Sequence, residues 1–311
     1  MLGAYIPGVR EPPETLQLLG LTKFYGQNLG VEDISFSVSP GEIVGFLGPN
    51  GSGKTTVLRM LVGLLSITRG SAALFGTDVT LGGPLLREKV GYLPGTLSLY
   101  GHMTARGYLG FLSRMRRRDC GARITDLSRR LDLDLDRRID DMSKGNKQKV
   151  GVIQAFMHDP DLLLLDEPTS GLDPIVQREF DDMLDEAGRR GAAVLLSSHV
   201  MGEVERLATH VAIINKGHLV VFDHVESLRD RTVRRVVLEF ATDGDARRFE
   251  SVPGFTVMTR SGRHVTGSIA GSQHELLQSA LRQNLVTVHS PEPSLDDLFI
   301  GLVNNGDARA T

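Results

Sequence analysis

Short apolar runs alternate with amphipathic helical patterns along the first two thirds of the chain. Residues 42–47 and 162–165 form two such runs, and a third, at 192–199, ends in two serines and a histidine. Apolar runs of this length are typical of parallel strands that are buried on both faces. Helical periodicity follows the first run as far as Leu65 and appears again over 147–157. The alternation predicts an α/β fold for this part of the chain.

The pattern changes near residue 225, where shorter strand patterns begin. We expect strands at 234–240, 255–260 and 264–269, a helix over 272–284, and a last strand within 287–303 that is followed by a helix capped near Ser294. Strands and helices in this mixture predict a small α+β domain over residues 226–311. It carries no complete chemical motif, so we interpret it as an accessory or regulatory domain.

Composition and charge narrow the choice of protein class. A chain of 311 residues has room for roughly two domains, and its net charge of -3 gives no indication of a nucleic-acid partner. The only cysteine, Cys120, rules out a disulfide within the chain. No apolar run approaches the roughly 20 residues that a membrane helix needs. Residues 1–14 hold prolines and glycines without an apolar signal core, so we expect a flexible N-terminal tail.

The first apolar run leads into a complete phosphate-binding motif. Gly48, Gly53, Lys54 and Thr55 occupy every fixed position of G-x-x-x-x-G-K-[ST], between a predicted strand and a predicted helix. Glycines let backbone N–H groups converge on one anion, while the lysine reaches the β- and γ-phosphates and the hydroxyl of Thr55 ligates Mg²⁺. The predicted phosphate cradle, residues 48–56, comprises Gly48, Pro49, Asn50, Gly51, Ser52, Gly53, Lys54, Thr55 and Thr56.

Two adjacent carboxylates follow the leucine run. Asp166 and Glu167 stand at the end of a predicted buried strand, where α/β sheets place their ligands. Alternation along a strand sends the two side chains in different directions, so they can have different roles. We expect Asp166 to support the Mg²⁺ shell, through a water, and Glu167 to polarise the attacking water. His199, at the end of the third apolar run, is a candidate sensor of the γ-phosphate.

A donor-rich segment, "MSKGNKQKVG" at 142–151, raises the question of what it holds. Ser143 is placed like an N-cap of the helix predicted over 147–157, which leaves free backbone N–H groups at a new helix N-terminus. These N–H groups form a second anion site, although the phosphate cradle already provides a complete one. We therefore expect the second site to bind a nucleotide held by another copy of the chain. The three lysines of the segment are interpreted as a solvated face.

Over residues 15–225 these motifs resemble the ATP-binding subunit of an ABC transporter. By position, the cradle corresponds to the Walker A loop, Asp166 to the Walker B aspartate, Glu167 to the catalytic glutamate and His199 to the switch histidine. Tyr25 in "LTKFYG" corresponds to the aromatic residue that stacks on adenine. The signature segment of that family corresponds to Ser143, Lys144, Gly145 and Asn146, and its D-loop to Ser170, Gly171, Leu172 and Asp173.

Three positions depart from the family pattern. Lys144 replaces the first glycine of the signature segment and Asn146 its glutamine, while Ser143 and Gly145 are kept. Gly95 stands where the family usually has a glutamine that joins the Mg²⁺ shell. Because glycine has no side chain, we expect a water or another residue to take that ligand position.

The resemblance implies a fold, a reaction and partners. We expect a P-loop ATPase core with a mixed sheet and a helical subdomain at about 96–160, and hydrolysis of ATP with Mg²⁺ coupled to translocation. The implied partners are one or more integral-membrane permease subunits and a second copy in a dimer around two ATP, at the cytoplasmic face of the cell membrane. The C-terminal pattern resembles ABC-2-type exporters related to daunorubicin resistance. Lipid or polysaccharide export, or a non-transport ABC ATPase acting on nucleic acid or ribosomes, are the alternatives.

Overall fold

A computed structural model of the chain describes residues 14–231, 234–249, 252–269 and 273–290. The chain divides into two compact units, Met1–Val225 and Glu226–Thr311, and each is described by itself. Residues 1–13 of the predicted N-terminal tail and the helix predicted near Ser294 lie outside the described residues.

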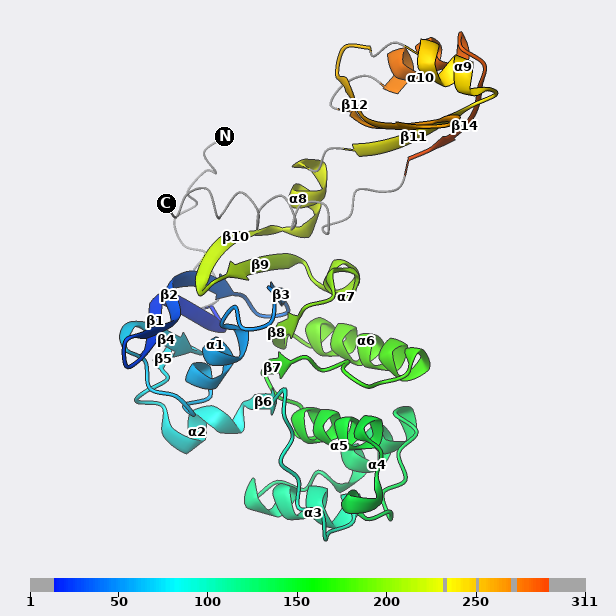
Figure 1. Ribbon diagram of the computed structural model, residues 1–311. Helices are drawn as coiled ribbons and strands as arrows, with labels where there is room; N and C mark the ends of the chain where they lie inside the picture. Colours follow the sequence, from blue (N-terminus) through cyan, green and yellow to red (C-terminus); the bar gives the residue numbers. More distant parts are fainter. Residues whose placement is uncertain (1–13, 232–233, 250–251, 270–272, 291–311) are drawn as a thin grey trace. The chain divides into compact units, whose positions relative to one another are not determined.

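The first unit is built on a ten-stranded sheet with the order β5-β4-β1-β2-β10-β9-β3-β8-β7-β6 (Figure 1). Its strands are β1 (Leu16–Tyr25), β2 (Asn28–Val38), β3 (Ile43–Leu47), β4 (Arg69–Leu74), β5 (Thr77–Asp78), β6 (Val90–Leu93), β7 (Leu162–Asp166), β8 (Ala193–Ser198), β9 (His210–Asn215) and β10 (His218–His224). The five neighbours β9, β3, β8, β7 and β6 pair in parallel, whereas β1, β2, β4 and β5 pair antiparallel. The predicted α/β core with a mixed sheet is confirmed.

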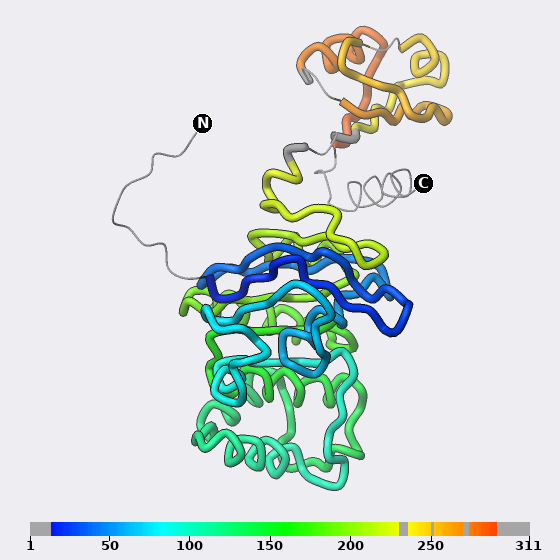
Figure 2. Tube along the Cα trace, turned by 90° about the vertical axis from the view of Figure 1, so that its left-hand side faces the viewer, coloured from blue at the N-terminus to red at the C-terminus, as the bar shows by residue number. Residues whose placement is uncertain are grey.

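Helices lie on both faces of the parallel strands and beyond the last of them. The helices of this unit are α1 (Lys54–Leu61), α2 (Gly83–Glu88), α3 (Ala105–Met115), α4 (Gly121–Arg130), α5 (Lys144–Phe156), α6 (Pro174–Arg189) and α7 (Met201–Leu207), with a short 3₁₀ helix, η1 (Ile139–Asp141). In Figure 1, α1 and α6 lie on opposite sides of the parallel strands, and α3, α4 and α5 gather beyond β6. Figure 2 shows the same grouping of α3 to α5 from a second direction.

Alternation along the buried strands divides the interior of this unit into two cores. On β7, Leu163 and Leu165 pack in one apolar cluster, and Leu162 and Leu164 pack in the other. All four leucines have an exposed fraction of 0%. A strand with a core on each face has no position for a polar side chain, which explains the uninterrupted leucine run.

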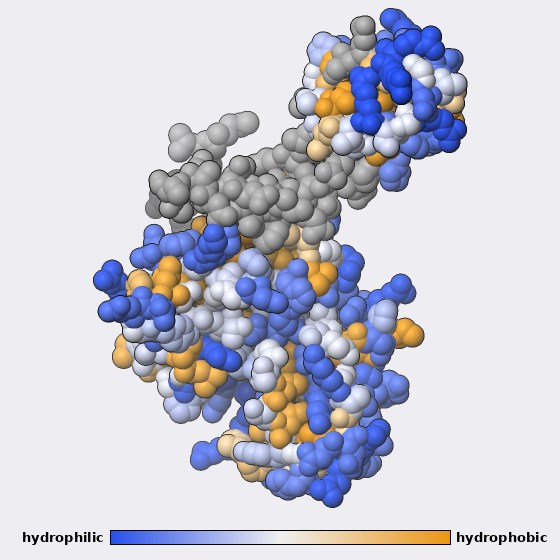
Figure 3. Space-filling model, viewed as in Figure 1, coloured by the Kyte–Doolittle hydropathy of each residue, from blue (hydrophilic) through white to orange (hydrophobic). Residues whose placement is uncertain are grey.

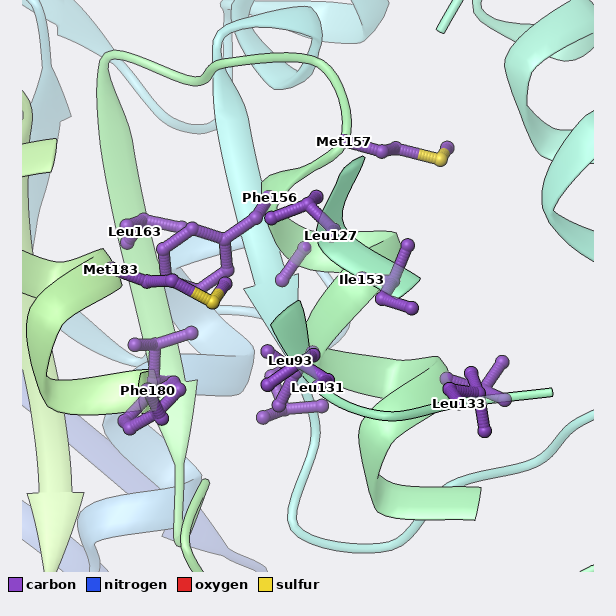
Figure 4. Close-up of a cluster of buried hydrophobic side chains, with 14 of the residues drawn as sticks. Leu93, Leu127, Leu131, Leu133, Ile153, Phe156, Met157, Leu163, Phe180 and Met183 are labelled. Carbon is purple, nitrogen blue, oxygen red and sulfur yellow. The ribbon is translucent and has the colours of Figure 1, made fainter. Parts of the chain in front are cut away.

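The core on the α5 side joins the helices to the sheet. Figure 4 shows Phe156 of α5 near Leu163 of β7 and Met183 of α6, and Ile153 and Phe180 belong to the same apolar cluster. The rings of Phe156 and Phe180 meet edge to face, with their centroids 6.0 Å apart. Truncating a buried phenylalanine of this kind to alanine costs about 3–5 kcal/mol of folding free energy. This packing fixes α5 against the strand that ends in Asp166.

Helix α5 differs from its prediction in two respects. It begins at Lys144, three residues before the predicted start at 147, because Ser143 caps it and its first turn includes the small residue Gly145. The expectation of a solvated lysine face is wrong for Lys149, which is 7% exposed and donates a hydrogen bond from Nζ to the carbonyl of Asp132 at 3.1 Å. The long aliphatic part of a lysine can be buried when its ammonium group finds an acceptor.

The second unit contains a four-stranded antiparallel sheet with the order β12-β13-β11-β14. Its elements are α8 (Val225–Arg231), β11 (Arg234–Phe240), α9 (Asp243–Arg248), β12 (Phe255–Ser261), β13 (His264–Ile269), α10 (Gln273–Leu281) and β14 (Leu285–His289). From β11 to β14 the connectivity is that of a ferredoxin-like split β-α-β arrangement. Apolar side chains of the sheet, α9 and α10 form a separate core, and the predicted α+β character of this region is confirmed.

Among the described residues, no helix is long and apolar enough to span a membrane. Figure 3 shows that hydrophilic residues dominate the visible face of each unit, with apolar residues in separate patches.

His158, between α5 and β7, is buried in the first unit with an exposed fraction of 1%. Its Nε2–H donates to the carbonyl oxygen of Val90 at 3.1 Å, and its Nδ1 has no hydrogen-bond partner within the described part of the chain. Burial, and next the positive charge of Arg116, lower the pKa of His158 to about 4. The imidazole is therefore neutral in the folded protein at pH values where an unfolded chain begins to protonate it.

We expect His158 to make stability fall as the pH falls. Because the unfolded chain takes up this proton below pH 6.5 and the folded chain does so only near pH 4, the free energy of unfolding should drop by about 2 kcal/mol between pH 7.5 and pH 5. Chemical denaturation of the wild type and of His158→Leu at both pH values measures this difference. The drop should be smaller in the variant by that amount, and it should remain in the control His218→Leu, which removes a half-exposed imidazole. Equal drops in wild type and His158→Leu would contradict the assignment.

Candidate nucleotide-binding site

The cradle, residues 48–56, runs from the end of β3 into the first turn of α1, and two of its positions favour glycine. Gly51 and Gly53 have φ values of 80° and 111°, in the region that favours glycine. A Cβ on Gly48 would lie 2.3 Å from the carbonyl oxygen of Ile214 on β9, so the loop is held close to the sheet. Helix α1 then starts at Lys54, and its first N–H groups point back at the loop.

Two side chains of the cradle, Lys54 and Ser52, are placed to bind an anion. Lys54 is 6% exposed, and its Nζ donates to the loop carbonyls of Gly48 at 2.6 Å and Pro49 at 3.2 Å. Burial lowers the pKa of Lys54, and the nearby carboxylates of Glu167 and Asp166 oppose that effect. The Oγ of Ser52 is buried and has no hydrogen-bond partner among the described residues. A phosphate oxygen would satisfy this hydroxyl and the ammonium group together.

Asp166 lies at the carboxyl end of β7 with an exposed fraction of 2%. Thr55 donates from Oγ1 to Oδ2 of Asp166 at 2.7 Å, and Ser197 donates from Oγ to Oδ1 at 2.5 Å. The carboxylate thus joins α1, β7 and β8. Its oxygens and the Thr55 hydroxyl are hard ligands of the kind that Mg²⁺ prefers. In the described part of the chain, no three His, Cys, Asp or Glu side chains converge to hold a metal ion.

Glu167 follows β7 directly, and its carboxylate contacts a different partner from that of Asp166. Its backbone has a φ of 52°, which is uncommon for a residue with a side chain. The N–H of Glu167 donates to the Oγ and the carbonyl oxygen of Ser197, at 3.2 and 3.1 Å. Its Oε2 lies 2.7 Å from Nδ1 of His199, which follows β8 and has a half-exposed side chain. The structure brings Asp166, Glu167 and His199 together at one edge of the sheet.

A cavity of about 330 Å³ opens beside these groups. It is lined by Tyr25, Leu29, Gly30, Asn50, Gly51, Gly53, Lys54, Thr55, Thr56, Asp166 and Glu167. The half-exposed Tyr25 lies with its hydroxyl 3.3 Å from Oγ1 of Thr56, and Nζ of Lys23 lies 5.5 Å from the centre of its ring. A cavity lined by an aromatic side chain and a phosphate cradle suits a nucleotide.

The signature segment, residues 143–146, does not line this cavity within the described chain. Ser143 caps α5 as predicted, since its Oγ accepts a hydrogen bond from the N–H of Asn146 at 3.2 Å. Both Ser143 and Lys144 are exposed. A Cβ on Gly145 would lie 2.6 Å from the carbonyl oxygen of Gly171, so the signature segment rests on the D-loop of its own chain.

The D-loop, residues 170–173, begins beside Glu167 and ends as a helix cap. The N–H of Ser170 donates to the carbonyl oxygen of Glu167 at 3.2 Å, and Leu172 is buried. Asp173 accepts hydrogen bonds from the backbone of Ile175 at 3.1 Å and Val176 at 3.0 Å, and caps α6. These backbone hydrogen bonds lower the pKa of the Asp173 carboxyl.

The sequence did not predict roles for three residues that hold the site together. Ser197 bonds both Asp166 and the backbone of Glu167, and Gln148 of α5 donates from Nε2 to the carbonyl oxygen of Pro168 at 2.9 Å. Glu203 accepts hydrogen bonds from Thr169 at 2.8 Å and Ser198 at 2.9 Å. The one available signal was the change from apolar to small polar residues at the end of the run at 192–199.

A phosphate cradle between a parallel strand and a helix, with two carboxylates at the end of a neighbouring strand, defines a P-loop nucleotide-hydrolysing protein. Residues 31–170 match the family described as ABC transporter. The chain is 39% identical over 204 residues to the ABC transporter ATP-binding protein NatA of Bacillus subtilis, covering 64% of this chain and 83% of that protein. The chain belongs to the ATP-binding subunits of ABC transporters and is an ATPase.

Other relatives match over nearly the whole chain. The Nod factor export ATP-binding protein I of Rhizobium meliloti is 32% identical, covering 96% of this chain and 90% of that protein. The bacitracin transport ATP-binding protein BcrA of Bacillus licheniformis is 30% identical, covering 92% of this chain and 96% of that protein. A solved ATP-binding subunit of an ABC transporter superposes with a TM-score of 0.66 at 29% identity, covering 70% of this chain and 92% of that one.

Gly95 lies against the carboxylate of Asp166. A Cβ at this position would stand 2.9 Å from Oδ2 of Asp166 and 3.2 Å from its Cγ. We expect Gly95→Ala to push the carboxylate away from Thr55 and to weaken ATP binding in the presence of Mg²⁺ by about five- to tenfold, the value of one hydrogen bond. Titration of a fluorescent ATP analogue with and without Mg²⁺ measures this effect.

The matched control is Gly202→Ala, because a Cβ on Gly202 meets no other atom within 4 Å. Gly202→Ala should bind the analogue like the wild type. An unchanged affinity of Gly95→Ala in Mg²⁺ would show that the contact with Asp166 does not shape the site.

Proposed function

We propose that this chain is the ATP-hydrolysing motor subunit of an ABC exporter, held at the cytoplasmic face of the cell membrane by a separate permease. The observation that carries the proposal is the convergence of Lys54, Thr55, Asp166 and Glu167 on one cavity. Two relatives that match over nine tenths of this chain are named for Nod factor export and bacitracin transport; the first name supports the direction of transport and both support a transporter.

The residues divide the reaction between them. The cradle N–H groups and Lys54 hold the phosphates of ATP, and the ring of Tyr25 stacks on the adenine. Thr55 and Asp166 would hold Mg²⁺, Asp166 through a water. Mg²⁺, when bound, neutralises charge on the β- and γ-phosphates. Glu167 polarises the attacking water, and His199, at 2.7 Å from the Glu167 carboxylate, orients that carboxylate and contacts the γ-phosphate.

A second copy completes each site. Ser143, Lys144, Gly145 and Asn146 lie outside the cavity of their own chain, so the free N–H groups behind Ser143 serve the γ-phosphate in the partner chain. The D-loop, residues 170–173, lies between the two sites. Two chains arranged head to tail therefore enclose two ATP molecules. Binding favours the closed dimer because the contacts to the γ-phosphate exist only there, and hydrolysis removes them.

We assign the transporter to the ABC-2-type exporters related to daunorubicin resistance, with drugs or other hydrophobic compounds as cargo. The supporting sequence element, "PSLDDLF" at 293–299, lies outside the described residues. The ferredoxin-like part of the C-terminal unit serves as an accessory domain that supports the dimer or regulates it. Lipid or polysaccharide export by the same motor is the alternative for the cargo.

We expect Glu167→Gln to bind ATP but not to hydrolyse it, and so to accumulate as a dimer. The amide keeps the shape of the side chain and loses the negative charge that polarises the water, which should reduce kcat by at least about a hundredfold. Size-exclusion chromatography with ATP and Mg²⁺ measures the dimer, and phosphate release measures the turnover. Glu88→Gln, at an exposed position on α2, is the matched control. Wild-type turnover in Glu167→Gln would refute the assigned role.

The motor function also requires a membrane partner. We expect the tagged chain, purified from gently solubilised membranes of its native host, to carry a stoichiometric protein with several membrane helices, identified by mass spectrometry. Recovery of the chain alone, or with DNA or ribosomes, would contradict the exporter while leaving the ATP site intact.

A further inference from the structure

Gln148 makes a connection that the roles proposed above do not use. Its side chain is 7% exposed on α5. Its Nε2 donates to the carbonyl oxygen of Pro168 at 2.9 Å and approaches that of Glu167 at 3.4 Å. Both carbonyls belong to the turn that follows β7 and carries the catalytic carboxylate.

This turn contains a strained residue that is held from two sides. Glu167 has a φ of 52°, a conformation that is unfavourable for a residue with a side chain and persists only where the surroundings enforce it. Ser197 of β8 accepts a hydrogen bond from the N–H of Glu167, and the side chain of Gln148 on α5 approaches the carbonyl oxygen of the same residue. The direction of the Glu167 carboxylate therefore depends on the position of α5 as well as on the sheet.

The N-terminus of α5 is the signature segment. Ser143 caps the helix five residues before Gln148, a rise of roughly 7 Å along one rigid element. Gly145 rests on the carbonyl of Gly171, and the N–H of Ser170 donates to the carbonyl oxygen of Glu167. A contact at the signature segment that moves α5 is thus transmitted to Glu167 of the same chain through Gln148.

We infer that Gln148 is a positioning residue that ties the catalytic carboxylate of its own chain to the engagement of its own signature segment. This inference rests on the proposed function, in which the signature segment binds the ATP of a partner chain. Each chain would then hydrolyse its own ATP fastest when its signature segment is occupied, which couples the two sites of the dimer.

The first test compares Gln148→Leu with Gln154→Leu in the full chain. Both remove an amide from α5, but the Gln154 side chain accepts a hydrogen bond from Tyr108 at 2.8 Å instead of contacting the Glu167 turn. In Gln148→Leu we expect kcat for ATP to fall at least about tenfold with KM changed less than about threefold, because misplacing a reacting group costs rate more than binding. Thermal unfolding of both variants reports the structural effect. Gln148→Glu, which keeps the shape but loses the donor, provides the same test if the leucine variant does not fold.

The second test is a double-mutant cycle with Ser143→Ala. If Gln148 transmits the engagement of the signature segment, the loss of kcat in Ser143→Ala should be smaller in the Gln148→Leu background than in the wild type. If the two substitutions reduce kcat by independent factors, so that the double variant shows their product, the coupling is overturned. A kcat of Gln148→Leu equal to that of Gln154→Leu, or a change confined to KM, would overturn the positioning role.

Two measurements distinguish a failure of this inference from a failure of the proposed function: ATP turnover by the wild type, and ATP-dependent dimerisation of Glu167→Gln. When both are present, the variants of Gln148 decide the inference alone. If the wild-type chain does not hydrolyse ATP and the Glu167→Gln variant does not dimerise with ATP, the proposed function is contradicted.

Discussion

The buried carboxylate of Asp166 is the constraint on which the rest of the site depends. A carboxylate with an exposed fraction of 2% is stable only if hydrogen-bond donors surround it, because a charge without partners is costly to remove from water. Thr55 and Ser197 supply those donors from α1 and β8. The need to satisfy one charge therefore fixes the start of the cradle helix against the ends of two strands. Gly95 belongs to the same arrangement, since any side chain there would press on the carboxylate.

The sheet makes this arrangement possible by burying its strands on both faces. Alternate leucines of β7 face two different cores, so packing on both faces holds this strand in place. The parallel strands β3, β7 and β8 end at the same edge, where the cradle follows β3 and where Asp166 and Ser197 lie in the last residues of β7 and β8. Packing energy spread over many residues thus positions a few polar groups to within hydrogen-bond distance.

Helix α5 connects the signature segment to the turn that carries Glu167. It carries Ser143 at its exposed N-terminus, shares an apolar cluster with β7 through Ile153 and Phe156, and contacts the Glu167 turn through Gln148. The core therefore gives the signature segment a rigid support. The same support lies next to the residue that is proposed to activate water. This arrangement suits an ATPase in which two copies work together.

The sequence by itself determined the elements whose signals are local. The glycine-rich loop, the leucine run and the cap at Ser143 each depend on a few adjacent residues, so the cradle, β7 and α5 could be predicted without knowledge of their neighbours. The family of the chain follows from the same motifs and their order. Only the tertiary structure decided which distant side chains complete the site. Ser197 stands 31 residues from Asp166, and Gln148 stands 20 from Pro168, and no local pattern marks such hydrogen bonds because folding creates them.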